Sequence, residues 1–134
     1  MSSGTLRPGL SDPGAATAPV VFVLADDLIW ATRLEDAVTA AGGQARRVRH
    51  LEGLASALKG VGSPYAIVDL TARAYDGVAA VRQAAGTGAR VVAVGQHDDA
   101  ALRKAALEAG AERVFTYRAL FEDGPRSIAR WLGR

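Results

Sequence analysis

The sequence predicts one α/β domain built on a doubly wound sheet of five parallel strands. From residue 20 onward, short apolar runs alternate with stretches that repeat apolar residues at helical spacing. The runs are apolar at consecutive positions, as expected for parallel strands that are covered by helices on both faces. Five such βα units fit within the 134 residues, a length typical of a single domain.

The apolar runs predict the strands, and the one run that is polar predicts the order of the strands in the sheet. The second run is polar and rich in arginine, so we expect it at an edge of the sheet. With right-handed crossovers, this placement favours the strand order 2-1-3-4-5. The five expected strands cover residues 20–25, 45–49, 65–70, 90–94 and 113–116.

Polar caps, glycines and one proline set the expected helix ends. The first helix begins after the acidic pair at 26–27 and ends at the glycine pair 42–43. Either Asp98 or Asp99 is expected to cap the fourth helix, and Pro125 to begin the last one. Two tryptophans, Trp30 and Trp131, occupy helical positions expected to face the core.

Composition excludes several classes of function. The chain has no cysteine and two histidines, which excludes disulfides, thiolate zinc sites and cysteine catalysis and argues against a multi-histidine metal site. The net charge of +2 argues against a nucleic-acid-binding surface.

Residues 1–19 are rich in proline, glycine and serine, and we expect a disordered leader before a folded domain at 20–134. Without an apolar segment for export or membrane insertion, a cytoplasmic location is expected.

Three aspartates fall where strands of the predicted sheet end. Asp26 and Asp27 follow the first strand, and Asp69 lies at the end of the third. In the order 2-1-3-4-5 these strands are neighbours, so the carboxylates are expected to converge at the switch point of the sheet. Such oxygen ligands suit Mg²⁺, and a central carboxylate there could attack a phosphoryl group.

These motifs resemble the receiver domain of the bacterial two-component response regulators, the CheY-like family. The resemblance rests on the acidic pair 26–27, on Asp69 in residues 67–70 (IVDL), on residues 76–77 (DG) and on residues 109–111 (AGA). It covers nearly the whole predicted domain. It implies that Asp69 accepts a phosphoryl group from a histidine kinase and that the acidic pair holds Mg²⁺.

The chain also departs from the family pattern at two switch positions. Gly95 stands at the end of strand four, where the family has a serine or threonine. Tyr117 and Arg118 stand at the end of strand five, where the family has a lysine followed by a proline. The loss of the lysine charge and of the hydroxyl indicates an atypical, or pseudo-, receiver. We expect Gly95, His97, Tyr117 and Arg118 to form the rim of the pocket.

Structural roles compete with these functional ones. Asp69 could instead bind the loop that follows it, and Asp26 or Asp27 could cap the first helix. His97 could simply be exposed to solvent. The basic stretch 46–50 could bind an anion, although its charges are also typical of a protected edge strand.

Three functions are consistent with the sequence. The first is a stand-alone, degenerate receiver that regulates a partner by protein–protein contact with weak or no phosphoryl switching. The second is a single-domain response regulator phosphorylated at Asp69 in a phosphorelay. The third is a flavodoxin-like domain that binds a small molecule or nucleotide. Because the sequence lacks the usual nucleotide and hydrolase motifs, we do not expect an enzyme.

Partners are expected to be proteins, with no membrane or nucleic acid involved. A histidine kinase or a downstream regulator would fit the family resemblance. Receivers usually bind partners or form homodimers through helix four, strand five and helix five. In this chain that surface is expected to include several basic side chains and one tyrosine: Arg103, Tyr117, Arg118, Arg126 and Arg130.

Overall fold

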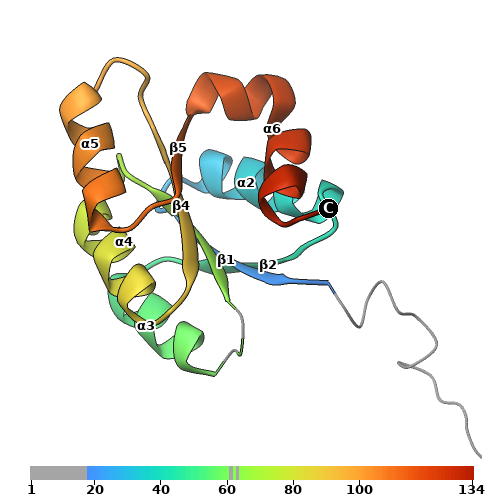
Figure 1. The fold of residues 1–134 in the computed structure, drawn as a ribbon, viewed down its shortest axis with the longest axis horizontal. Helices are drawn as coiled ribbons and strands as arrows, with labels where there is room; N and C mark the ends of the chain where they lie inside the picture. The colour runs from blue at the N-terminus through green and yellow to red at the C-terminus, as the bar shows by residue number, and fades with distance from the viewer. Residues whose placement is uncertain (1–17, 61, 63) are drawn as a thin grey trace, which may run out of the picture.

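The computed structural model describes residues 18–60, 62 and 64–134, and it contains the predicted sheet (Figure 1). The strands are parallel and follow the order β2-β1-β3-β4-β5, which confirms the predicted topology. Strand ends agree with the sequence prediction to within one residue. The strands are β1 (Val20–Leu24), β2 (Gln44–Val48), β3 (Tyr65–Asp69), β4 (Arg90–Gly95) and β5 (Arg113–Thr116).

Helices cover both faces of the sheet. Two of them, α2 and α6, lie side by side on one face, and α3, α4 and α5 cover the other (Figure 1). Their bounds are α2 (Leu28–Ala40), α3 (Leu51–Lys59), α4 (Gly77–Gly86), α5 (Ala100–Ala109) and α6 (Tyr117–Trp131). Most of the expected leader, residues 1–17, lies outside the described residues.

The core consists of two apolar layers separated by the sheet. Successive residues of β1 alternate between them, because side chains alternate along a strand. Val23 packs with Leu34 of α2 and Ile128 of α6, whereas Leu24 packs in the layer that contains Leu54 of α3 and Val81 of α4. Burial on both faces explains why the sequence of β1 is continuously apolar.

The last helix differs from its prediction. We expected it to begin at Pro125, but α6 begins at Tyr117, directly after β5. The side chain of Thr116 caps it by accepting a hydrogen bond of 3.0 Å from the amide of Ala119. A kink at Asp123 (φ −150°, ψ 32°) divides the helix, and Pro125 lies in the first turn of its second half.

Among the other expected helix features, Asp99 caps α5 and Trp131 is buried, as predicted. The prediction for Trp30 is wrong, because this side chain is only half-buried and lines the cavity described below. No helix in the described part of the chain has the length and apolar character needed to cross a membrane.

Candidate functional site

A polar cavity of about 700 Å³ opens at the carboxyl edge of the sheet. Residues from the ends of β1, β3, β4 and β5 surround it, as expected for the switch point of a doubly wound sheet. The three aspartates of the sequence prediction all line this cavity. The lining residues are Asp26, Asp27, Trp30, Asp69, Thr71, Arg73, Gln96 and Tyr117.

Asp69 is the last residue of β3, and it is only 2% exposed. Its Oδ1 accepts hydrogen bonds of 3.0 Å from both the amide and the hydroxyl of Thr71. The Tyr117 hydroxyl donates a third hydrogen bond to the same oxygen and touches the Thr71 hydroxyl. These neutral donors satisfy one oxygen of a buried carboxylate, which would be costly to bury without partners.

Tyr117 reaches Asp69 because α6 starts immediately after β5. Its ring lies against the indole of Trp30 on α2, with 4.3 Å between ring centroids. Burial raises the pKa of the Tyr117 phenol above its usual value of 10, and the hydrogen bond to Asp69 raises it further. The phenol therefore stays protonated at neutral pH and acts as a donor to the carboxylate.

Asp26 and Asp27 each bind backbone amides. Oδ2 of Asp26 accepts hydrogen bonds from the amides of Arg73 (2.8 Å) and Ala74 (3.0 Å), in the loop between β3 and α4. Oδ1 of Asp27 accepts one of 3.0 Å from the Trp30 amide and so caps α2. The two neighbouring carboxylates thus have different structural roles: Asp26 holds a distant loop, and Asp27 starts a helix.

Tyr75 ties the ends of β1 and β3 together beside the cavity. Its hydroxyl lies 2.8 Å from the carbonyl oxygen of Leu24 and 2.9 Å from that of Asp69. Burial, followed by the nearby carboxylates of Asp69 and Asp26, raises the pKa of this phenol above its usual value of 10. The hydroxyl proton is shared between two carbonyl groups at the strand ends.

The fit of this site to Mg²⁺ depends on how the carboxylates converge. Among the residues that the structure describes, no group of three or more acidic or histidine side chains is close enough together to hold a metal ion. Asp26, Asp27 and Asp69 each have one oxygen occupied by protein donors. As arranged, the three side chains do not form a ligand set, and the magnesium site stays a prediction.

Only one of the four residues expected at the rim lines the cavity, namely Tyr117. Gly95 is buried as the last residue of β4, His97 is exposed beyond it, and Arg118 forms an exposed ion pair with Glu122. No ion pair found within the described ranges includes Asp26, Asp27 or Asp69.

Sequence reasoning missed four lining or bridging residues. Thr71 carries a usable signal, because a threonine two positions after an aspartate can close a local turn through its amide and hydroxyl. Gln96 directly follows the end of β4, a position that faces the switch point. No local pattern identifies Arg73 or Tyr75.

Of the comparisons with known proteins, the one with solved structures identifies the fold. Neither the models of known protein families nor the curated proteins gave a significant match. Solved structures do match. A two-component response regulator from Clostridium difficile has a TM-score of 0.74 at 11% identity, with 87% of this chain and 97% of that chain covered. A CheY-like receiver domain protein from Methanospirillum hungatei has a TM-score of 0.71 at 13% identity, with coverages of 87% and 92%.

A third match is a response regulator from Burkholderia pseudomallei whose structure contains a phosphorylated aspartic acid, a calcium ion and citrate. Its TM-score is 0.66 at 16% identity, and the alignment covers 86% of this chain and 71% of that chain. At such identities the likeness concerns the fold: this chain has the fold of response regulator receiver domains.

Proposed function

We propose that this chain is a receiver-like signalling domain that regulates a partner protein by contact, with weak or no phosphoryl switching at Asp69. The observation that carries the proposal is the hydrogen bond from the Tyr117 hydroxyl to Oδ1 of Asp69. The family resemblance puts a lysine at the position of Tyr117. Here a neutral phenol takes that position and is bound to the carboxylate.

The chemistry of phosphorylation explains why this contact matters. To be phosphorylated, a carboxylate oxygen of Asp69 must attack phosphorus, form an acyl phosphate and expel the leaving group. Three donors on Oδ1 stabilise the carboxylate and lower its nucleophilicity. The acyl phosphate would add negative charge beside Asp26 and Asp27, and no cation in the described part of the chain forms an ion pair with these residues.

Phosphorylation by a small donor tests this proposal. The full chain is incubated with acetyl phosphate and Mg²⁺, and its intact mass is measured. We expect little or no stable phosphoadduct, and no difference between the native chain and Asp69→Asn, which controls for modification elsewhere. Efficient formation of a phosphoadduct that is absent in Asp69→Asn would overturn the proposal that phosphoryl switching at Asp69 is weak or absent.

That overturning result would support the second candidate, a phosphorylatable single-domain response regulator. One observation favours this candidate: Oδ2 of Asp69 has no hydrogen-bond donor among the described residues, and the side chain lines the cavity. An attacking oxygen is therefore available, and this candidate function requires in addition that the charge on the phosphoryl group is balanced.

Nucleotide binding, the third function considered from the sequence, has less support from the site. Three carboxylates line the cavity against one arginine, Arg73, so the phosphates of a nucleotide would meet excess negative charge. A thermal-shift screen with nucleotides, flavins and divalent ions measures this directly, since a bound ligand raises the melting temperature.

A further inference from the structure

An exposed stripe runs along α2 on the side next to α6. Ile29, Arg33, Asp36 and Ala40 follow one another at intervals of four, three and four residues, so they lie on one face of the helix. All four side chains are exposed, and Ile29 is 66% exposed, which is unusual for a large apolar side chain. Phe121 of α6, 69% exposed, lies beside this stripe.

The two charges in the stripe have no ion-pair partners within the described residues. The Arg33 guanidinium lies over the rings of Trp30 and Phe121, 5.6 and 5.0 Å from their centroids, and pairs with no carboxylate of the part of the chain that the structure describes. Within the described residues, the Asp36 side chain has neither an ion pair nor a hydrogen bond. A cation and an anion one helical turn apart are thus both available to a partner.

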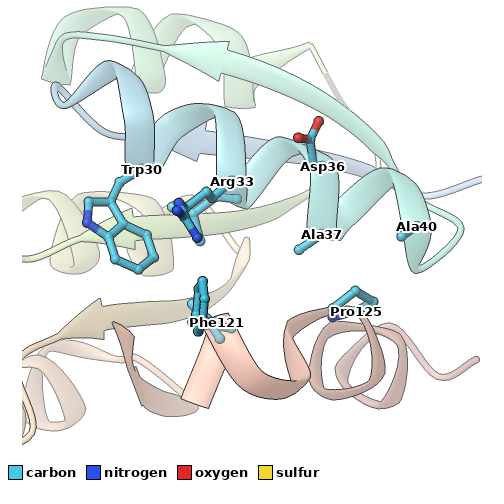
Figure 2. A pocket seen from close by; sticks show the side chains of 9 residues that line it. Trp30, Arg33, Asp36, Ala37, Ala40, Phe121 and Pro125 are labelled. Atoms are coloured by element: carbon cyan, nitrogen blue, oxygen red, sulfur yellow. The ribbon is translucent and has the colours of Figure 1, made fainter. Parts of the chain in front are cut away.

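The same face carries a projection and a hollow. A cavity of about 340 Å³ lies between α2 and α6. Phe121 stands at the end of this cavity near Arg33, while Pro125 faces Ala37 and Ala40 at the other end (Figure 2). The hollow exists there because both residues of α2 are alanines and because α6 is kinked at Asp123.

We propose that this face binds a second copy of the chain, with the two α2 helices antiparallel about a two-fold axis that passes between residues 34 and 35. In this arrangement Arg33 lies opposite the partner's Asp36, and Ile29 lies opposite the partner's Ala40. The pairs 33/36 and 29/40 have the same midpoint along α2, between residues 34 and 35. A single two-fold axis at that point therefore places opposite charges against each other and a large side chain against a small one.

The same two-fold axis also places the projecting Phe121 side chain against the cavity between α2 and α6 of the other copy. Along α2, Phe121 lies at the position of Arg33. The two-fold axis places this position opposite residue 36 of the second copy, next to that copy's cavity at Ala37 and Ala40. A face that fits itself in charge, size and shape meets the requirement for an isologous dimer. The observations therefore favour a second copy over an unrelated protein.

This face differs from the one expected from the sequence, which comprised α5, β5 and α6. On α5, Leu107 is the exposed large apolar residue within the described range, and it is 44% exposed. Leu107 and its neighbour Lys104 are therefore suitable control positions, because substitutions there alter α5 and leave the α2–α6 face intact.

Charge reversal with rescue tests the proposal. Sedimentation velocity over a concentration series gives the dimer dissociation constant of the full chain. We expect the native chain to dimerise, Arg33→Glu and Asp36→Arg each to raise the constant about tenfold or more, and the double variant R33E/D36R to restore it. Lys104→Glu makes the same charge change as Arg33→Glu and is expected to have no effect, as is Leu107→Ala, whereas Phe121→Ala weakens the dimer.

Introduced cysteines test the geometry independently of affinity. The chain has no cysteine, so the introduced thiols are the only ones. With I29C and A40C combined, mild oxidation is expected to give a covalent dimer. Ile29→Cys alone is not, because the two copies of position 29 lie about 16 Å apart along antiparallel helices, too far for a disulfide.

Each outcome decides the proposal. A monomer at all concentrations overturns it, as does a dimer that Arg33→Glu leaves intact or that Leu107→Ala dissociates. Equal cross-linking of the double and single cysteine variants also overturns it. Dimerisation that is lost in either single charge variant and regained in the double variant supports it.

Discussion

The Tyr117 hydroxyl donates a hydrogen bond to Oδ1 of Asp69 and so joins the first residue of α6 to the last residue of β3. The Tyr117 ring also lies against Trp30 of α2. The carboxylate at the centre of the site is therefore in contact with α6 directly and with α2 through one ring. In this arrangement, a change at Asp69 Oδ1 acts directly on both of its hydrogen-bond partners, Tyr117 and Thr71.

Tyr75→Phe should lower stability while leaving the fold intact. The substitution removes the hydroxyl that bonds the carbonyl groups of Leu24 and Asp69, and the two acceptors lose a buried donor. We expect the free energy of unfolding to fall by about 1–3 kcal/mol. Urea denaturation measures it, and an unchanged midpoint would show that water replaces the hydroxyl without cost.

Two glycines of the same helix should respond to alanine in different ways. At Gly77, the first residue of α4, an added Cβ would lie 2.7 Å from the Cα of Leu70, which is backbone and cannot move aside cheaply. Gly77→Ala is expected to cost about 1–3 kcal/mol of unfolding free energy. At Gly86, the last residue of α4, no described atom beyond its chain neighbours and the nearby backbone of its own helix lies within 4 Å of the added Cβ.

Gly86→Ala is therefore the matched control. We expect it to leave stability unchanged or to raise it by up to about 1 kcal/mol, because alanine favours helix more than glycine does. Thermal unfolding of both variants gives the comparison. Equal destabilisation of the two would mean that the close approach of α4 to Leu70 does not matter.

The ion pair between Arg90 and Glu112 should contribute to stability in a pH-dependent manner. Arg90 donates two hydrogen bonds to Glu112, of 2.9 and 2.8 Å, and these lower the pKa of the carboxyl below its ordinary value of 4.5. Because the pKa of Glu112 is lower in the folded state than in the unfolded state, the ion pair stabilises the fold at pH values above the unfolded-state pKa. This contribution is lost as the pH falls through the folded-state pKa.

Glu112→Gln is accordingly expected to cost about 0.5–1 kcal/mol at neutral pH, since the pair is partly exposed to solvent. The difference from the native chain should shrink as the pH falls below 4.5. Glu122→Gln removes the more exposed pair with Arg118 and should change little. A difference for Glu112→Gln that persists undiminished into acid would contradict the assignment.

Much of the fold follows from the sequence, and the reason is physical. Runs such as residues 20–24 are apolar at every position because both faces of the strand are buried, as is typical of parallel strands between two helix layers. The arginines of β2 correctly placed it at an edge. Because parallel strands end at one edge of the sheet, the three aspartates were also expected to come together.

The partners of those aspartates could not be predicted in the same way. Asp26 accepts hydrogen bonds from two backbone amides that are 47 and 48 residues away. Every residue type except proline has a backbone amide, so the amino-acid sequence does not identify such a partner. Tyr117 was expected at the rim of the pocket and on the partner-binding surface, but not as a hydrogen-bond donor to Asp69. Its contact with Asp69 depends on α6 starting at the Thr116 cap, and the proline at 125 had predicted a later start.

Hydrogen exchange should show that Asp26 holds the loop between β3 and α4. In Asp26→Ala the amides of Arg73 and Ala74 lose their acceptor, and we expect their exchange to accelerate about fivefold or more. Asp27→Ala is the matched control, because it exposes the Trp30 amide instead. Faster exchange of Arg73 in both variants, or in neither, would contradict separate roles for the two carboxylates.

The most direct test of the central claim is the rate at which acetyl phosphate and Mg²⁺ modify Asp69 when Tyr117 is replaced. Tyr117→Phe removes the hydroxyl but keeps the ring against Trp30, and Tyr117→Lys also adds a positive charge. Intact-mass measurement over time, with Asp69→Asn as background, gives the three rates. The proposed function predicts a rate at least about tenfold higher in Tyr117→Lys than in the native chain, with Tyr117→Phe between them. A native chain that is modified as fast as both variants would show that Tyr117 does not restrain Asp69.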